Sequence, residues 1–167
     1  MRYWLIGLLS VIALVLQSTV LARLPLMGVR PDLTLLLVVS VAVLGGPLEG
    51  AAAGAIAGGL QDLMHGRYLG ISLVSKAATG YLAGLLERRL YRENPLVMAG
   101  VAGAATTLHH LVYFLGLRLL GSDVNFLASV WYVALPLSIV HAVLSPLFCR
   151  PGWYQTVEHR LRQVVGG

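Results

Sequence analysis

Six apolar stretches follow one another along the chain, separated by short breaks rich in polar residues, glycine or proline. They cover residues 3–22, 33–48, 50–64, 69–86, 95–120 and 126–148. The first has 20 residues, and a helix of that length is about 30 Å long, the thickness of the hydrocarbon layer of a bilayer. Charged residues make up 11 % of the chain, against about 25 % in soluble domains. We therefore predict an all-α polytopic membrane protein, a six-transmembrane-helix bundle over residues 1–150.

The arginines predict which side of the membrane each end of the bundle faces. The chain termini and the connections after the second and fourth stretches carry seven: Arg2, Arg88, Arg89, Arg92, Arg150, Arg160 and Arg162. The opposite side carries four: Arg23, Arg30, Arg67 and Arg118. Because cytoplasmic loops are enriched in Lys and Arg, we predict that both termini are cytoplasmic. Merging stretches 33–48 and 50–64 into one span would give five spans and move one terminus to the other side.

Residues 151–167 form a polar tail after the last apolar stretch. Tyr154, Val157, Leu161 and Val164–Val165 recur there at helical spacing, with Arg160 and Arg162 between them. This pattern predicts a short amphipathic helix on the cytoplasmic surface of the membrane; a frayed terminus is the alternative. The loops are too short for a soluble catalytic domain, so we expect the chain to act within the bilayer or through its helix faces.

Four glycines recur at intervals of four residues in the third stretch and just before it: Gly46, Gly50, Gly54 and Gly58. Between Gly45 and Gly59, eleven of fifteen residues are Gly or Ala. Small residues on one helix face allow a second helix to approach closely, which favours association inside a membrane. This face serves either packing within the bundle or contact with a partner subunit, such as a second copy of the chain.

Five polar residues lie in the half of the bundle that this topology places outside: Gln17, Asp32, Gln61, Asp62 and Lys76. Ionisable groups inside a membrane usually face the protein interior and pair with one another. We therefore expect these side chains to line an outward-facing polar cavity, with Asp62 as the partner of Lys76 and Asp32 as the alternative partner. The competing interpretation is that both aspartates lie at the interface and that Lys76 extends to the headgroups.

Three histidines lie in the last two stretches. His109 and His110 are adjacent, with Tyr113 one turn later, and His141 lies in the sixth stretch. Metal motifs need converging ligands at a defined spacing, which adjacent histidines do not provide. We therefore expect no metal or other cofactor and predict interhelical hydrogen bonds for His109, His110, Tyr113 and His141. No catalytic motif is present.

The first half of the chain resembles the MreD family of bacterial rod shape-determining proteins. The resemblance begins at Arg30-Pro31-Asp32-Leu33 and continues through the glycine ladder into Leu60-Gln61-Asp62-Leu63. A short loop with Gly66 and Gly70, followed by Leu73, completes it. Together these elements cover residues 17–90. The second half is similar only in hydropathy and length.

This resemblance implies a non-enzymatic subunit of the elongasome in the bacterial inner membrane. The implied partners are an MreC-like membrane protein, MreB filaments, RodA, a class-B penicillin-binding protein and membrane lipids, with no nucleic acid. The family is also similar to the six-helix S components of energy-coupling-factor vitamin transporters, so a substrate-binding S component is the alternative function. S components typically dock through an Ala-x3-Ala face on the first helix, and Ala13 has no such partner here.

Overall fold

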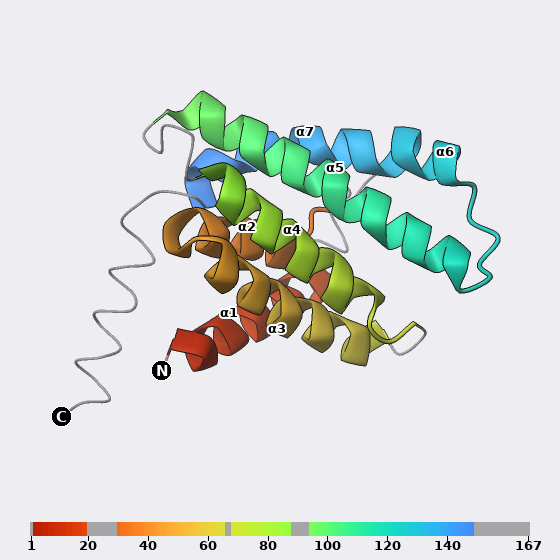
Figure 1. Cartoon of the computed structure of the whole chain (residues 1–167), viewed down its shortest axis with the longest axis horizontal. Coiled ribbons are helices and arrows are strands. Elements are labelled where there is room, and N and C mark those ends of the chain that lie inside the picture. The colour runs from red at the N-terminus through yellow and green to blue at the C-terminus, as the bar shows by residue number, and fades with distance from the viewer. Residues whose placement is uncertain (1, 20–29, 66–67, 88–93, 149–167) are drawn as a thin grey trace.

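The computed structural model describes residues 2–19, 30–65, 68–87 and 94–148, which form a bundle of helices (Figure 1). The helices are α1 (Arg2–Thr19), α2 (Leu33–Gly45), α3 (Pro47–His65), α4 (Ile71–Glu87), α5 (Pro95–Leu119), α6 (Phe126–Ser129), the π-helical segment η2 (Val130–Ala134) and α7 (Leu135–Phe148). These ranges contain no strand, which confirms the all-α class. The amphipathic tail predicted at 151–167 lies outside the described residues.

The second and third helices are divided differently from our expectation. α2 ends at Gly45 and α3 already begins at Pro47, so the chain reverses at Gly46 alone. The backbone of Gly46 has φ +89°, a conformation that costs glycine little, and Pro47 suits the first position of a helix. α2 therefore has 13 residues and is about 20 Å long, shorter than a hydrocarbon layer.

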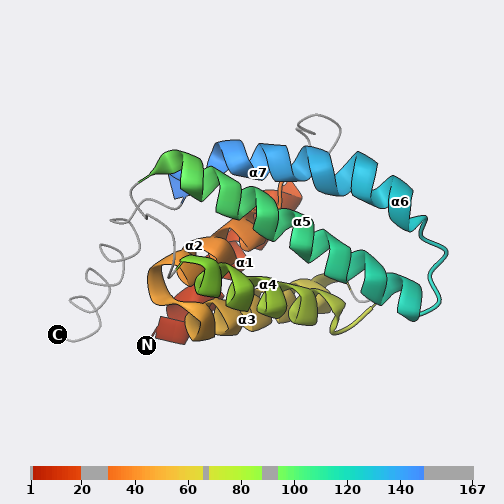
Figure 2. The same ribbon diagram turned by 45° about the horizontal axis from the view of Figure 1, so that its top comes forward.

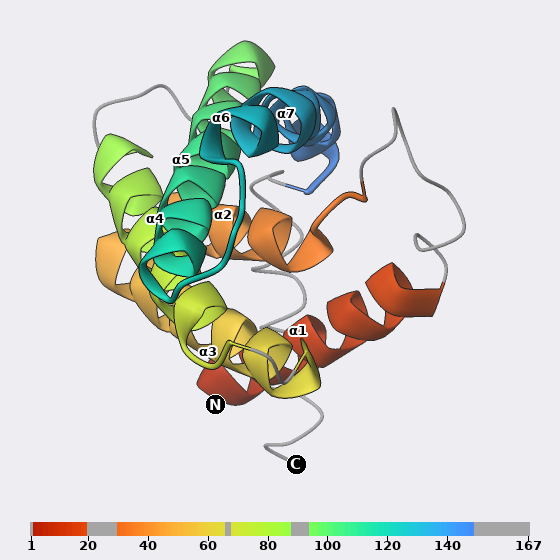
Figure 3. The ribbon, with the colours of Figure 1, turned by 90° about the vertical axis from the view of Figure 1, so that its right-hand side faces the viewer.

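The short helix α2 forms the centre of the bundle. Every residue from Thr34 to Val43 is buried, and the helix contacts α1, α3, α4, α5 and α7. The end-on view in Figure 3 shows α2 inside, with α1 to one side of the other helices. A helix that is apolar all round is the type that a core encloses. The start of α2 consequently lies inside the protein.

α3 and α4 make the most extensive helix contact of the structure. The two helices are antiparallel, and close backbone contacts recur every four residues along them. Gly46 faces Gly84, Gly50 faces Gly80, Gly54 faces Lys76 and Gly58 faces Ser72. A Cβ atom added at Gly50, Gly54 or Gly58 would overlap the backbone of α4. We call this contact the glycine seam. The ladder thus packs within the chain, and its partners Gly80 and Gly84 were not singled out from the sequence.

α5 and the α6–η2–α7 rod form a second layer over the α3–α4 layer (Figure 2). Asn94 caps α5, because its side-chain oxygen accepts a hydrogen bond from the Leu96 backbone N–H at 2.9 Å. Pro136 is the second residue of α7, which follows directly after η2. Proline lacks the N–H of the α-helical ladder and crowds the carbonyl four residues earlier. A π-helical turn at this point widens the ladder before the proline.

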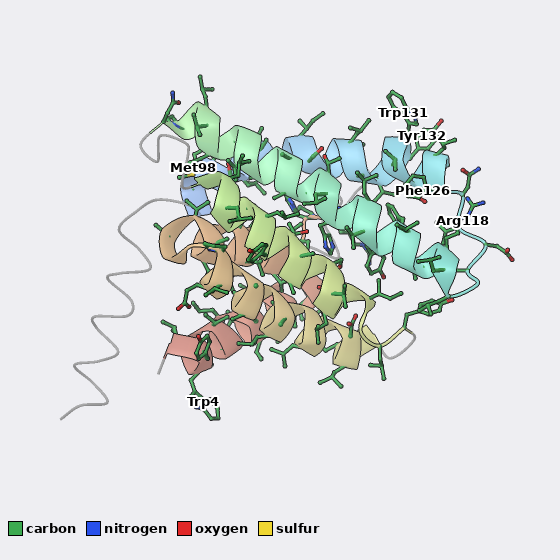
Figure 4. The ribbon with its side chains drawn as sticks, viewed as in Figure 1. Trp4, Met98, Arg118, Phe126, Trp131 and Tyr132 are labelled. Carbon is green, nitrogen blue, oxygen red and sulfur yellow. The ribbon has the colours of Figure 1, made fainter. Side chains whose placement is uncertain are left out.

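Two described helices are long and apolar enough to cross a membrane, Pro95–Leu119 and Phe126–Leu147. Three shorter apolar helices accompany them: Tyr3–Thr19, Leu33–Gly45 and Ile71–Leu86. Large aromatic side chains point outward near opposite ends of the bundle, with Trp4 at one end and Trp131 and Tyr132 at the other (Figure 4). Tryptophan and tyrosine are enriched where a protein meets the membrane–water interface.

Candidate functional site

Asp32 lies at the buried start of α2 and organises it. One carboxylate oxygen, Oδ1, accepts hydrogen bonds from the Leu35 backbone N–H at 3.0 Å and from the Thr34 hydroxyl at 2.6 Å. The other, Oδ2, forms an ion pair with Lys76 Nζ at 2.8 Å. Asp32 is thus both the N-cap of α2 and the counter-ion of a lysine on α4. A carboxylate suits this place because the first N–H groups of a helix have no partner in the helix itself.

Lys76 is completely enclosed by protein, with 0 % of the residue exposed. Its ammonium group contacts Asp32, the Thr34 hydroxyl and the Gln61 side-chain oxygen. An ammonium group has three protons to donate, so these three partners satisfy it. We call Asp32, Thr34, Gln61 and Lys76 the polar cluster. It joins α2, α3 and α4 at one point inside the bundle.

Our expectation that Asp62 pairs with Lys76 is wrong, and the alternative partner Asp32 makes the ion pair. Asp62 instead accepts backbone hydrogen bonds from Gly70, Ser72 and Leu73 at 2.9, 3.1 and 3.0 Å. These N–H groups lie at the start of α4, which carries the positive end of the helix dipole. Asp62 reaches them because it lies one helical turn beyond Gly58 on the glycine seam.

His141 links three helices. Its Nε2 accepts a hydrogen bond from the Asp32 backbone N–H at 2.9 Å, and its Nδ1 lies 2.8 Å from the Thr106 hydroxyl oxygen. Because the backbone N–H can only donate, this network assigns the proton of the neutral ring to Nδ1. The Thr106 hydroxyl donates in turn to the Ala102 carbonyl at 2.7 Å. His141 therefore ties α7 to α5 and to the start of α2.

The other aromatic residues of the predicted set do not bridge helices in this way. His110 Nδ1 lies 2.9 Å from the Thr106 carbonyl in its own helix. His109 is buried, and its Nδ1 has no hydrogen-bond partner among the described residues. Its ring lies 4.9 Å from the His110 ring and 5.9 Å from the Tyr113 ring, measured between centroids. Of the four predicted residues, only His141 makes an interhelical hydrogen bond within the part of the chain described.

The five residues predicted to share one cavity separate into three groups. Asp32, Gln61 and Lys76 belong to the polar cluster, and Asp62 caps the neighbouring helix. Gln17 lies near the end of α1, and its side-chain oxygen is buried without a hydrogen-bond partner among the described residues. Thr34 and Thr106 were not among the predicted site residues. The Asp-x-Thr spacing at a helix start indicates Thr34, whereas no sequence feature points from Thr106 to His141.

A cavity of about 410 Å³ lies beside the polar cluster, between the α3–α4 and α5–α6 connections. We call it the polar cavity; its lining is Gln61, Asp62, Tyr68, Ser72, Tyr113, Leu117 and Ser122. Two further cavities border α1, and their linings are almost entirely apolar. The described residues contain no group of three or more His, Cys, Asp or Glu that could hold a metal ion.

Long apolar helices around an enclosed ion pair fit the class of helical membrane proteins. Comparison with models of protein families then shows to which family within this class the chain belongs. The family model of the rod shape-determining protein MreD matches residues 1–151, and the chain belongs to the MreD family. It is thus a member of a family of shape-determining proteins of the bacterial inner membrane. No curated protein and no solved structure matches the chain.

Proposed function

We propose that this chain is a non-enzymatic membrane subunit of the bacterial elongasome that binds an MreC-like membrane protein. Through that partner it would help control cell shape and lateral peptidoglycan synthesis, together with MreB, RodA and a class-B penicillin-binding protein. The observation that carries the proposal is the family match, which extends over every described helix. The same match favours this function over that of a vitamin-binding S component.

We further propose six spans with both termini in the cytoplasm. The start of α1 and the end of α7 lie at one end of the bundle, whereas the α3–α4 and α5–α6 connections lie at the other (Figure 1). The seven-to-four distribution of arginines supports the same orientation. The short helix α2 is compatible with six spans because its start is enclosed by protein, where backbone groups find partners without lipid contact.

Labelling of introduced cysteines in intact cells tests this orientation. In a Cys149→Ser background, Asp123→Cys places a thiol in the α5–α6 connection, and Gln163→Cys places one in the C-terminal tail. A membrane-impermeant maleimide should label the first position and leave the second unlabelled until the cells are opened. Labelling of the tail in intact cells would reverse the orientation.

The exposed face of α1 is our proposed contact surface for the MreC-like partner. Trp4, Leu8 and Val11 are exposed there and border a cavity of about 530 Å³. Gly7 borders the same cavity, and a Cβ added to it would meet nothing within 4 Å. A glycine with open space at its Cβ position, beside large apolar side chains, allows a second transmembrane helix to pack closely.

Co-purification with a co-expressed MreC-like protein tests both the partner and the surface. Gly7→Leu should reduce recovery of the partner several-fold. Gly100→Leu is the matched control, because Gly100 on α5 also has open space around its Cβ position. Equal recovery with both variants would remove α1 as the contact surface. Failure of the unaltered chain to retain the partner would contradict the proposed function.

A further inference from the structure

The polar cavity differs in chemistry from the two cavities beside α1. Its volume of about 410 Å³ lies within the range of about 300–1,000 Å³ found for small-molecule sites. Hydroxyl, amide and carboxylate groups line it together with tyrosine rings and Leu117. Such a mixture of apolar surface and a few convergent polar groups is typical of a ligand site.

The charges around the polar cavity disfavour an ionic ligand. Asp62 is the only charged residue among the described residues of its lining, and it opposes an anion. Lys76 cannot compensate, because its three protons are already directed to Asp32, Thr34 and Gln61. A cation would meet a carboxylate that already accepts three backbone hydrogen bonds. The described lining therefore suits neither an anionic nor a cationic ligand.

The hydroxyl groups of the lining suit an uncharged partner instead. The side-chain hydroxyls of Tyr113 and Ser122 make no hydrogen bond to another described residue, although both border the cavity. A hydroxyl both donates and accepts, so these groups can pair with other hydroxyls. Tyrosine rings provide apolar surface next to their polar ends. A sugar or polyol presents the same alternation of C–H surface and hydroxyl groups.

We propose that the polar cavity binds an uncharged polyhydroxyl group, a sugar or a polyol. The group is either a free molecule or the headgroup of a lipid. In the six-span orientation proposed above, the cavity lies at the periplasmic end of the bundle. The binding itself does not depend on the elongasome partner, so it stands or falls separately from the proposed function.

Two contacts connect the polar cavity with the centre of the bundle. Gln61 lines the cavity and also contacts Lys76. Tyr113 lines it and packs against His109, whose Nδ1 is a buried atom without a partner among the described residues. A bound ligand would therefore rest on Gln61, which joins α3 to α4 through Lys76, and on Tyr113 of α5. Its binding should raise the thermal stability of the whole bundle by mass action.

Binding is tested with the full-length chain purified without glycoside detergents and placed in nanodiscs of phosphatidylcholine. The free probe is methyl β-glucoside, followed by saturation-transfer NMR. The lipid-borne probe is monoglucosyl diacylglycerol, followed by native mass spectrometry. Thermal unfolding is recorded with each probe. Tyr113→Phe and Ser122→Ala each remove one hydroxyl from the lining, and Tyr132→Phe is the matched control because Tyr132 on η2 is exposed and is not among the described residues that line the cavity.

We expect at least one probe to bind and to raise the melting temperature. Tyr113→Phe and Ser122→Ala should each weaken binding about fivefold, the effect of one lost neutral hydrogen bond, and Tyr132→Phe should not. Binding of the lipid alone would identify a headgroup site, and binding of both a sugar site. Absence of binding by either probe overturns the proposal, as does equal affinity in all three variants. Tighter binding of glycerol 3-phosphate or ethanolamine, with the same dependence on Tyr113, would replace the uncharged ligand by an ionic one.

Discussion

The α3–α4 pair and the α5–α7 pair are the two most extensive helix contacts in the molecule, and different forces hold them. Backbone meets backbone along the glycine seam, so that no Cβ fits at Gly50, Gly54 or Gly58. Between α5 and α7, the glycine nearest to the contact is Gly103, where a Cβ would lie at an ordinary 3.5 Å from the Ser138 carbonyl. There the specific link is the hydrogen bond between Thr106 and His141.

This difference shows two solutions to the same problem. No hydrophobic force drives helices together inside a bilayer, so close packing and hydrogen bonds must do so. The α3–α4 pair relies on close packing and should tolerate no added atom. The α5–α7 pair relies on a polar contact and should tolerate small changes of volume. The four predictions below test this contrast, and each is measured by equilibrium unfolding in mixed detergent micelles.

The largest effect should follow from Lys76→Met, which removes the positive charge that α4 directs towards α2. It leaves the Asp32 carboxylate buried without a counter-ion, a change that costs about 3–5 kcal/mol. The double variant with Asp32→Asn should recover part of that loss.

The matched control for this cycle is Lys76→Met with Asp62→Asn, because Asp62 makes no ion pair with Lys76. Its two effects should add. Coupling of Lys76 to Asp62 rather than to Asp32 would contradict the arrangement of the polar cluster.

The next largest effect should follow from Gly54→Ala, because the added methyl group overlaps the α4 backbone at Lys76. Separating the two helices to admit it should cost about 2–3 kcal/mol.

Gly100→Ala makes the same chemical change at an open position of α5. It should leave stability unchanged or raise it by up to about 1 kcal/mol, since alanine favours the helix. Equal responses at the two positions would show that the glycine seam does not limit helix approach.

A smaller loss should follow from His141→Leu, which tests the polar contact of the α5–α7 pair. The Asp32 backbone N–H loses the acceptor that His141 provides, and the Thr106 hydroxyl, which still donates to the Ala102 carbonyl, loses the hydrogen bond from His141; we expect a loss of about 2 kcal/mol. Val143→Leu, at an exposed position of the same helix, should stay within about 0.5 kcal/mol. A comparable loss at both positions would mean that the hydrogen bonds of His141 do not stabilise the bundle.

The smallest effect should follow from Gly103→Ala, on the α5–α7 contact. The new methyl group would lie at ordinary van der Waals distance from α7, so we expect a change within about 0.5 kcal/mol. A loss as large as that of Gly54→Ala would remove the contrast between the two helix pairs.

Local patterns in the sequence predicted the features of the fold that depend on neighbouring residues. Hydropathy located the described helices to within about three residues, and the interval of four identified the glycine ladder. The start of α5 at residue 95 was predicted as well, and it too is local, because the cap involves residues only two positions apart. These features are determined within one or two helical turns.

The pairing of Lys76 could not be read in this way, because it depends on the length of α2. A helix continuing to residue 48 would be long enough to carry Asp32 towards the membrane surface. The chain instead reverses at Gly46, and the shorter helix leaves Asp32 inside the bundle near Lys76. The link from Thr106 to His141 spans 35 positions, and no local pattern encodes it.

Because the small residues are equally spaced, α3 and α4 could pack closely in more than one register. The polar groups decide which residue of α3 faces which residue of α4. If α4 slid by four residues, Gly54 would face Gly80 and Gly50 would face Gly84, and the two smooth faces would still fit. The slide would, however, carry Lys76 away from Asp32 and move the first N–H groups of α4 away from Asp62. The contacts of Asp32 and Asp62 thus select one register of α4 from several that fit the shapes of the two helices almost equally well. Weakening the contacts of both aspartates while keeping every glycine should give a helix pair that still packs tightly but adopts more than one register.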